Sequence, residues 1–307
     1  MKQYIKQQLI KALDKTSLKF NESLSGHTSF RIGGPAKAFY VAKTTEQLIK
    51  AVKLARNLKI PYFILGSGSN ILVSDKGFKG IVIKLQGSGF RVQGLRIFAE
   101  SGVLLSKLVK FATENSLSGL EFAAGIPGTL GGAIVGNSGA KTGSISDVIE
   151  KVTVLGKAKG PPWEWPEDSP GVKELACSNC RFSYRTSRFK KSGEVILLAV
   201  LKLKKAKKSE IKKRIKKTLE SRKNQPWGKS AGCIFKNPKN KSAGVVIEQA
   251  GLKGQRVGDA EISKKHANFI INRGHAKASD VLELIALVKK KVWEKFKVRL
   301  EEEIVII

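Results

Sequence analysis

The stretch Tyr62-Phe-Ile-Leu-Gly-Ser-Gly-Ser-Asn70 joins an apolar strand directly to a loop that contains two glycines. Glycine lets a backbone approach a ligand closely, and successive N–H groups of such a turn can bind an anion. Ser67, Ser69 and Asn70 add donors that suit phosphate oxygens. Ile71 stands at the third glycine position of the dinucleotide-binding fingerprint, and a strand-like run follows it instead of a helix. By itself, the loop fits a phosphate site and a simple turn equally well.

A second glycine-rich segment favours the phosphate site. Residues 125–140 read Gly-Ile-Pro-Gly-Thr-Leu-Gly-Gly-Ala-Ile-Val-Gly-Asn-Ser-Gly-Ala, with six glycines in sixteen residues. Two such loops in one β-rich region are suited to a dinucleotide that is held by its pyrophosphate. The alternative is close packing of strands at bends, which also selects glycine.

The surrounding sequence alternates short strands with amphipathic helices, which predicts an α+β fold. Apolar residues at helical spacing predict helices over 5–13, 44–57, 104–114 and 279–296, the last of which begins with Ser-Asp. Short β-rich runs predict strands at 62–65, 71–73, 81–83, 152–155, 195–200 and 304–307. Residues 157–170 carry four prolines and two tryptophans, Trp163 and Trp165, and are expected to form a loop.

The charge of the chain is unusual. Its 307 residues indicate about two domains, and its formal net charge of +32 favours polyanionic partners. Residues 202–223 hold twelve Lys and Arg against two Glu, with Ile211, Ile215 and Leu219 in helical register. We expect a solvated basic helix between two domains. A nucleic-acid-binding function is the rival interpretation, but the sequence has no known RNA-binding signature, so we expect no specific nucleic-acid partner.

Three cysteines give little support to a disulfide framework or a metal site. Cys177 and Cys180 form one C-x-x-C pair, while a zinc site would need a second pair or suitably spaced histidines. We therefore expect two reduced thiols and no metal. The N-terminus lacks the apolar core of a signal peptide, and the longest apolar run, Val195 to Leu201, is too short to cross a membrane. The expectation is a cytoplasmic protein with no membrane partner.

A series of motifs resembles the UDP-N-acetylenolpyruvoylglucosamine reductase (MurB) family of peptidoglycan synthesis. The motifs occur in order from about Leu24 to the C-terminus. They are Thr28-Ser-Phe-Arg-Ile-Gly-Gly-Pro-Ala36, the two glycine loops, Tyr184-Arg-Thr-Ser187, Ser230-Ala-Gly-Cys-Ile-Phe-Lys-Asn-Pro238, Ala250-Gly-Leu-Lys-Gly254, Ser263-Lys-Lys-His-Ala-Asn-Phe269 and Leu300-Glu-Glu-Glu-Ile304. Residues 188–194 lead at once into a strand, which resembles the shorter form of the family, without the loop that lays a tyrosine over the substrate.

The resemblance implies a two-part FAD-binding domain of the PCMH/vanillyl-alcohol-oxidase type, followed by a smaller α+β domain that binds the UDP-sugar. We expect an N-terminal helix in residues 1–25, the FAD-binding domain in 26–205 and the substrate-binding domain in 206–307. Neither glycine loop contains Cys or His, so FAD is expected to be held without a covalent bond. The predicted cofactor-binding residues are Gly66, Ser67, Gly68, Ser69, Asn70, Gly125, Ile126, Pro127, Gly128, Gly131, Gly132 and Ala133.

The resemblance also implies a reaction. NADPH reduces FAD, and the flavin then delivers hydride to C3 of UDP-N-acetylglucosamine enolpyruvate, which gives UDP-N-acetylmuramate. Arg185 and Glu303 match the pair that stabilises the enolate, and Glu303 would have to be protonated or shared with Arg185. Cys233 matches the donor of a proton to C2, where most relatives carry serine. An ordinary thiol, with a pKa near ~8.5, is a stronger acid than an alcohol.

The same motifs imply residues that bind the substrate, namely Tyr184, Lys236, Asn237 and Lys253. Arg31, with Gly33 and Gly34, is expected to shape the flavin pocket, and we expect a monomer. A different flavin oxidoreductase, acting on an alcohol or a sugar lactone, remains an alternative. It would explain the glycine loops but not the motif around Cys233 or the C-terminal glutamate.

Overall fold

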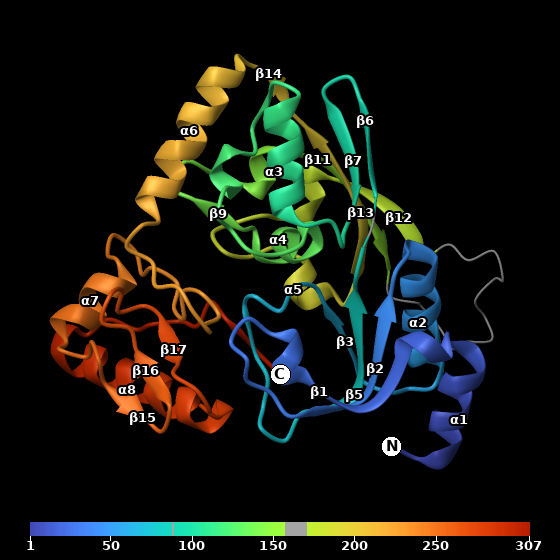
Figure 1. Ribbon diagram of the computed structural model, residues 1–307, viewed down its shortest axis with the longest axis horizontal. Helices are drawn as coiled ribbons and strands as arrows, with labels where there is room; N and C mark the ends of the chain where they lie inside the picture. Colours follow the sequence, from blue (N-terminus) through green and yellow to red (C-terminus); the bar gives the residue numbers. More distant parts are fainter. Residues whose placement is uncertain (88, 157–170) are drawn as a thin grey trace.

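The structure is a computed structural model that describes residues 1–87, 89–156 and 171–307 (Figure 1). The loop predicted over 157–170, with Trp163 and Trp165, lies outside the described residues. The described chain forms two sheets side by side, followed by a smaller unit of helices and short strands, drawn in orange and red (Figure 1). The α+β architecture predicted from the sequence is confirmed.

The first sheet has the strand order β1-β2-β5-β3, which are Leu18–Ser23, Pro35–Ala42, Phe78–Leu85 and Tyr62–Leu65. β1 and β2 are antiparallel, and the other pairs are parallel. Helices α1 (Gln3–Ala12) and α2 (Thr45–Asn57) cover it, with Leu9, Leu48 and Val52 in the shared core. Residues 1–25, expected to hold an N-terminal helix, contain α1 and also strand β1. Its residues alternate between half-buried and exposed, the pattern of an edge strand.

The second sheet is antiparallel, with the order β12-β11-β13-β7-β6. Its strands are Val172–Ala176, Ile149–Leu155, Val195–Lys202, Arg96–Glu100 and Phe90–Gln93. Helices α3 (Leu105–Glu114) and α4 (Leu130–Gly136) pack against it, and Leu108, Leu130, Val152 and Leu201 are fully buried between them. Shorter elements here are β8 (Leu117–Ser118) with β14 (Lys204–Lys205), β9 (Gly139–Ala140) with β10 (Gly143–Ser144), and α5 (Phe189–Ser192).

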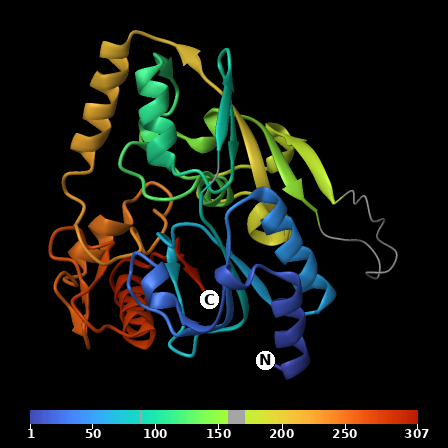
Figure 2. The same cartoon turned by 45° about the vertical axis from the view of Figure 1, so that its right-hand side comes forward.

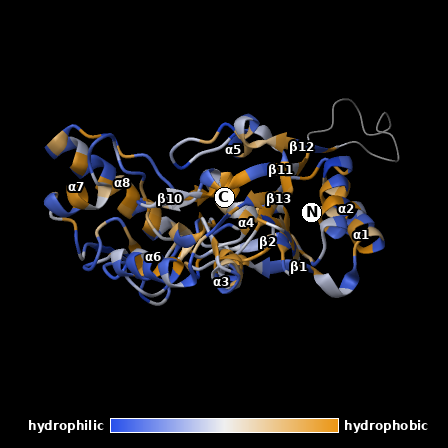
Figure 3. Ribbon diagram, turned by 90° about the horizontal axis from the view of Figure 1, so that it is seen from above, coloured by the Kyte–Doolittle hydropathy of each residue, from blue (hydrophilic) through white to orange (hydrophobic). Residues whose placement is uncertain are grey.

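The basic segment forms helix α6 (Lys208–Ser221), drawn largely in blue when coloured by hydropathy (Figure 3). It does not stand free in solvent, because it packs against α3 and the turn at Glu121. Arg214 Nη1 lies 3.0 Å from Ser118 Oγ and 3.6 Å from Glu121 Oε1, and Ile211 is buried. The division predicted at residue 206 thus assigns α6 to the second unit, although this helix packs on the first unit.

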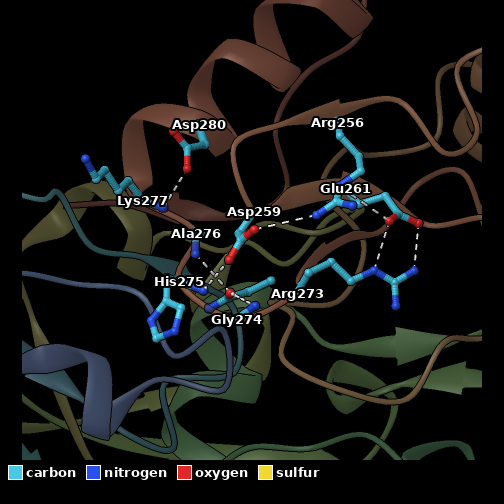
Figure 4. Close-up of polar contacts among 10 residues, drawn as sticks. Arg256, Asp259, Glu261, Arg273, Gly274, His275, Ala276, Lys277 and Asp280 are labelled. Carbon is cyan, nitrogen blue, oxygen red and sulfur yellow. Dashed lines mark hydrogen bonds and ion pairs between the residues drawn. The ribbon is translucent and has the colours of Figure 1, made fainter.

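The last third forms its own core from helices α7 (Ala243–Gln249) and α8 (Ala278–Phe296) and the antiparallel strands β15-β16-β17. These strands are Arg256–Val257, Ala260–Ile262 and Ile270–Asn272. Figure 4 shows the polar contacts at their ends. Arg273 binds the buried carboxylate of Glu261 through two contacts, of 2.7 and 2.9 Å, so the charge of Glu261 is paired.

Among the contacts that join this unit to the first part of the chain, two fix the start of α8 and the C-terminus. Asp75, in the loop before β5, accepts hydrogen bonds from the backbone N–H groups of Ala278 and Ser279, at 2.7 and 3.0 Å. A side chain distant in the sequence thus caps α8, whereas Ser-Asp was predicted to start it. Asp280 accepts a bond from the Lys277 N–H, 2.9 Å away (Figure 4).

The second contact is made by the end of the chain. Strand β18 (Val305–Ile306) pairs in parallel with β4 (Ile71–Leu72), which follows the first glycine loop. In Figure 2 the red C-terminal end lies beside blue and cyan segments of the first part of the chain, and β18 and β4 form a two-stranded sheet of their own. The residues just before β18 are therefore held beside that loop.

Candidate active site

A cavity of about 1310 Å³ lies where the two sheets, α6 and the last third of the chain meet. It exceeds the roughly 300–1,000 Å³ that is usual for a small-molecule site. Both glycine loops line it, with all twelve residues predicted to bind the cofactor, and the predicted catalytic residues line it too. The cavity therefore has room for a dinucleotide and for a second ligand beside it.

The glycines of the first loop have a structural role that the sequence did not separate from ligand binding. A Cβ at Gly66 would overlap Thr129 Oγ1, and one at Gly68 would overlap the His27 carbonyl. Gly68 also has φ +64°, a conformation that favours glycine. These two glycines let the protein pack on itself, which was the alternative interpretation.

The second glycine segment contains helix α4 from Leu130, although the whole segment was predicted as a loop. A Cβ at Gly131 would lie 2.9 Å from Ser101 Cβ, so this glycine permits close packing. At Gly132 the nearest atom would be 3.5 Å from the Cβ, so this part of the wall is open toward the cavity. A wall without side chains fits a flat ligand such as FAD.

The polar side chains of the first loop are mostly engaged with the protein. Ser69 Oγ donates to the Pro127 carbonyl, 3.0 Å away, and ties the two glycine loops together. Asn70 Nδ2 donates to the Glu303 carbonyl, 3.1 Å away. Ser67 has no hydrogen-bond partner among the described residues and lines the cavity. Of the donors predicted for phosphate oxygens, the Ser67 hydroxyl is thus the one left available.

Glu303 and Arg185 face each other at the cavity wall. Glu303 N–H donates to the Ile234 carbonyl, 2.8 Å away, which with the Asn70 contact fixes the backbone of Glu303 from both sides. Arg185 Nε lies 2.9 Å from Glu303 Oε1. Nε is buried and makes no well-aligned hydrogen bond with the described residues, so its contact with Glu303 is an ion pair. Arg185 itself has φ +55°, which is uncommon for a residue other than glycine. Residues in such conformations often cluster at functional sites.

Burial raises the pKa of the Glu303 carboxyl above its ordinary value of 4.5, although Arg185 and Lys190 act in the opposite direction. The neutral form of Glu303 is therefore favoured more than in water. This agrees with the requirement that Glu303 be protonated, or share its charge with Arg185, if it is to lie near a developing oxyanion.

Cys233 lies in the same wall and makes an isolated antiparallel bridge with Phe269. Burial, followed by the nearby Glu303 carboxyl, raises the pKa of its thiol to about 12, while Arg185 and Arg222 act to lower it. The sequence predicted a thiol of ordinary acidity, and the structure corrects that expectation. Cys233 holds its proton throughout the neutral range, as a proton donor must.

Three further residues at the cavity were missed from the sequence. Lys190 lies on α5, and partial desolvation with repulsion from Lys236 lowers the pKa of its amine. Arg222 follows α6, and its guanidinium makes no hydrogen bond or ion pair with the described residues. Trp227 lines the cavity with 92% of its surface exposed. Lys190 and Arg222 could have been suspected only from their proximity in sequence to recognised motifs.

The residues predicted to bind the substrate lie outside the cavity lining. The Asn237 N–H lies 3.3 Å from the hydroxyl of Tyr184, so these two residues come together. Lys236 pairs with Glu301 at 3.0 Å, and its charge affects both Lys190 and Glu303. Lys253 instead pairs with Glu248 on α7, 2.6 Å away. The structure thus groups the first three residues near the catalytic pair but does not bring Lys253 to them.

Helix α6 contributes one face to the cavity. Lys212 and Lys216 line it, whereas Lys213 and Lys217 do not. The expectation of a wholly solvated basic helix is therefore wrong, because alternate lysines of α6 face the site.

Comparison with known proteins decides the family. A family model for the C-terminal domain of UDP-N-acetylenolpyruvoylglucosamine reductase matches residues 223–307, and one for an FAD binding domain matches residues 36–161. The UDP-N-acetylenolpyruvoylglucosamine reductase of Clostridium tetani is 44% identical over 302 residues, which cover 97% of this chain and 95% of that protein. The chain belongs to this family.

Other relatives agree with this assignment. The reductase of Caldicellulosiruptor bescii is 46% identical over 92% of this chain and 88% of its own. The crystal structure of the MurB reductase from Thermus caldophilus has a TM-score of 0.77 and 38% identity, covering 94% of this chain and 97% of that one. The predictions of an FAD-dependent oxidoreductase and of FAD as its cofactor are confirmed.

The described residues lack a metal site and a membrane-spanning helix. They contain no group of three or more His, Cys, Asp or Glu side chains that could hold a metal ion. Cys177 and Cys180, on a short helical turn after β12, are free thiols. No helix in the described parts of the chain is long and apolar enough to cross a membrane.

Proposed function

We propose that this protein reduces UDP-N-acetylglucosamine enolpyruvate to UDP-N-acetylmuramate, with NADPH as the reductant. The observation that carries the proposal is that Arg185, Glu303 and Cys233 converge on the wall of the cavity that both glycine loops line. The reduction of an enolpyruvyl ether requires a cation or strong donors for the enolate and an acid near C2. Arg185 and Cys233 supply these, and the raised pKa of Glu303 limits its repulsion of the enolate.

FAD, when bound between the glycine loops, would accept a hydride from NADPH and pass it to C3 of the substrate alkene. Addition of hydride at C3 places negative charge on C2 and on the adjoining carboxylate, as an enolate. The guanidinium of Arg185, which lines the cavity, stabilises this charge. Lys190 adds a second cation at the same wall.

Glu303 orients Arg185 and limits repulsion of the enolate. Their 2.9 Å contact fixes the guanidinium, and the raised pKa of Glu303 reduces the negative charge that faces the substrate. A neutral carboxyl at this position can also donate a hydrogen bond to the oxyanion, as an ionised one cannot.

Cys233 then donates its proton to C2. The thiol is fully protonated before the step, because its pKa is raised to about 12. The thiolate left after the transfer lies near Arg185 and Arg222, the two cations that favour its charged form. Solvent then restores the proton.

We propose that Tyr184, Lys236 and Asn237 hold the diphosphate and the sugar at the rim of the cavity. The Tyr184–Asn237 contact and the charge of Lys236 support this role. Lys253 stays a weaker prediction, because its ammonium group pairs with Glu248.

Anaerobic spectroscopy of the purified protein tests the proposal. The protein should be yellow, lose its flavin absorbance on addition of NADPH, and regain it on addition of UDP-N-acetylglucosamine enolpyruvate. UDP-N-acetylglucosamine, which lacks the alkene, is the matched control and should not restore the absorbance. A reduced protein that the enolpyruvyl compound leaves reduced would rule out this function.

A further inference from the structure

A second, smaller cavity adjoins the large one and has no role in the function proposed above. Its volume is about 410 Å³, and it shares Ser29, Ser67 and Gly228 with the large cavity. The remaining lining residues are Gly26, His27, Thr28, Arg31, Lys84 and Lys229. Arg31, predicted to shape the flavin pocket, belongs to this second cavity and does not line the first.

The walls of the second cavity are strongly cationic. Arg31, Lys84 and Lys229 all line it, and none of the described residues in its lining is acidic. The Lys84 amine is partly buried, which lowers its pKa, and the nearby Arg31 adds to that effect. Three cations without a carboxylate among them repel one another, so the arrangement is stabilised when an anion enters.

A chain of contacts holds the Lys84 amine in place. His27 Nε2 lies 3.0 Å from Glu22 Oε1, and His27 Nδ1 lies 3.2 Å from Lys84 Nζ. The contacts assign a proton to Nε2, which then donates to Glu22, while Nδ1 accepts from the ammonium group. The imidazole also stacks on Phe39, with ring centroids 4.2 Å apart. This leaves two N–H donors of Lys84 for a ligand.

Arg31 is held in an unusual backbone conformation at the same cavity. Its φ is +57°, in the left-handed region, and its N–H donates to the Thr28 carbonyl, 3.2 Å away. Its Nη1 donates to the Gly26 carbonyl at 3.1 Å, so the side chain folds back over the loop that forms one wall. Such strained residues occur where a ligand is clamped.

We propose that the second cavity binds a phosphoryl group of a nucleotide that extends into it from the large cavity. A phosphoryl group offers several acceptor oxygens and a negative charge, which match three cations and the hydroxyl of Ser67. The Ser29 hydroxyl already donates to the Ser230 carbonyl, 2.7 Å away. Ser67 belongs to the glycine loop beside the proposed FAD site and lines both cavities, so the two cavities adjoin at this residue.

Two nucleotides could supply this group. One source is the 2′-phosphate of NADPH, which rests on the proposed function, and the other is the diphosphate of FAD. Both present the same chemistry to Arg31, Lys84 and Lys229. NADP⁺ and NAD⁺ differ only in the 2′-phosphate, so their comparison separates the two sources.

The variant Lys84→Met tests the proposal, because it removes one cation and keeps the length of the side chain. The matched control is Lys79→Met, on the same strand β5, whose lysine is exposed and lines neither cavity. Calorimetry would measure the binding of NADP⁺ and NAD⁺ to the holoenzyme and of FAD to the apoprotein. Circular dichroism and thermal unfolding would show that each variant is folded.

Lys84→Met should weaken binding about tenfold or more for one nucleotide. Loss of NADP⁺ affinity with NAD⁺ affinity unchanged assigns the cavity to the 2′-phosphate, and loss of FAD affinity assigns it to the FAD diphosphate. If the affinities for NADP⁺ and FAD both match those of Lys79→Met, the proposal is overturned. Should Lys84→Met fail to fold, the exposed Lys229→Met gives the same readouts. Binding needs no turnover, so the result is independent of whether the enolpyruvyl substrate is reduced.

Discussion

Arg185 Nε lies 2.9 Å from Glu303 Oε1, and this contact joins the two parts of the chain that form the active-site wall. Arg185 comes from the loop before α5, whereas Glu303 stands two residues before β18. The parallel pairing of β18 with β4 and the bond from Asn70 to the Glu303 carbonyl set the position of Glu303. The position of Glu303 in the site therefore depends on the pairing of the C-terminal strand with β4.

The raised pKa of Glu303 predicts a specific dependence of stability on pH. Burial favours the neutral carboxyl in the folded protein, so ionisation of Glu303 lowers stability as pH rises from 4.5 through the raised pKa. The variant Glu303→Gln has no such loss. Its unfolding free energy relative to wild type should thus increase across this window, as measured by denaturant titrations at several pH values. If the unfolding free energy of Glu303→Gln relative to wild type falls as pH rises, the assignment is contradicted. The control is Glu302→Gln, at a carboxyl that pairs with Lys289.

The cap that Asp75 provides on α8 predicts a dependence of stability on pH that is opposite to that of Glu303. Burial acts to raise the pKa of Asp75, but the N–H groups of Ala278 and Ser279 outweigh it and hold the pKa below 3.8. The ionised cap thus stabilises the protein above pH 3.8, and this contribution disappears as pH falls through the lowered pKa. Asp75→Ala should cost about 0.5–2 kcal/mol at neutral pH. Urea denaturation would measure it, and an unchanged free energy of unfolding would show that α8 does not need this cap.

The two faces of α6 predict different effects of removing its charges. Lys212 and Lys216 line the cavity, while Lys213 and Lys217 do not. Both double substitutions to Gln remove two charges, so both should weaken polyanion binding and make its salt dependence shallower. Only the Lys212/Lys216 pair should also weaken FAD or substrate binding, by several-fold. Equal binding constants for the two double variants would show that the cavity-facing lysines do not contact ligand.

The glycine loops predict that FAD is bound without a covalent bond. None of the twelve cavity residues expected to contact it is a cysteine or a histidine. Heat or acid precipitation should release all of the flavin into the supernatant, where its absorbance is measured. Flavin that stays with the precipitated chain after washing would identify a covalent attachment elsewhere.

The sequence predicted the parts of the site that motifs carry, and missed the parts that long-range contacts create. Both glycine loops, Arg185, Cys233 and Glu303 were predicted, and all line one cavity. The thiol pKa of Cys233 was not, because it depends on burial and on Glu303, far along the chain. The sequence also did not predict that the side chains of Ser69 and Asn70 are already hydrogen-bonded. Their partners, Pro127 and Glu303, are remote in sequence.

The fold shows the same division between local and distant causes. Helix α2 and strand β13 follow from local periodicity, and the structure places them as predicted. Strand β1 was missed because its alternation is weak, with polar residues on the exposed face. The capping of α8 by Asp75 has no local signal at all. We place the division between the two units after α6, because Arg214 binds this helix to Ser118 of the first unit.

The two half-reactions of a Cys233→Ala holoenzyme test the central claim most directly. Reduction of the flavin by NADPH needs no proton from this side chain, and Cys233→Ser, which keeps a proton donor, is the matched control. Stopped-flow absorbance should show flavin reduction at the wild-type rate. Reoxidation by UDP-N-acetylglucosamine enolpyruvate should then slow by about 10²–10⁴-fold in Cys233→Ala and recover most of its rate in Cys233→Ser. Reoxidation of Cys233→Ala at the wild-type rate would show that the proton comes from elsewhere.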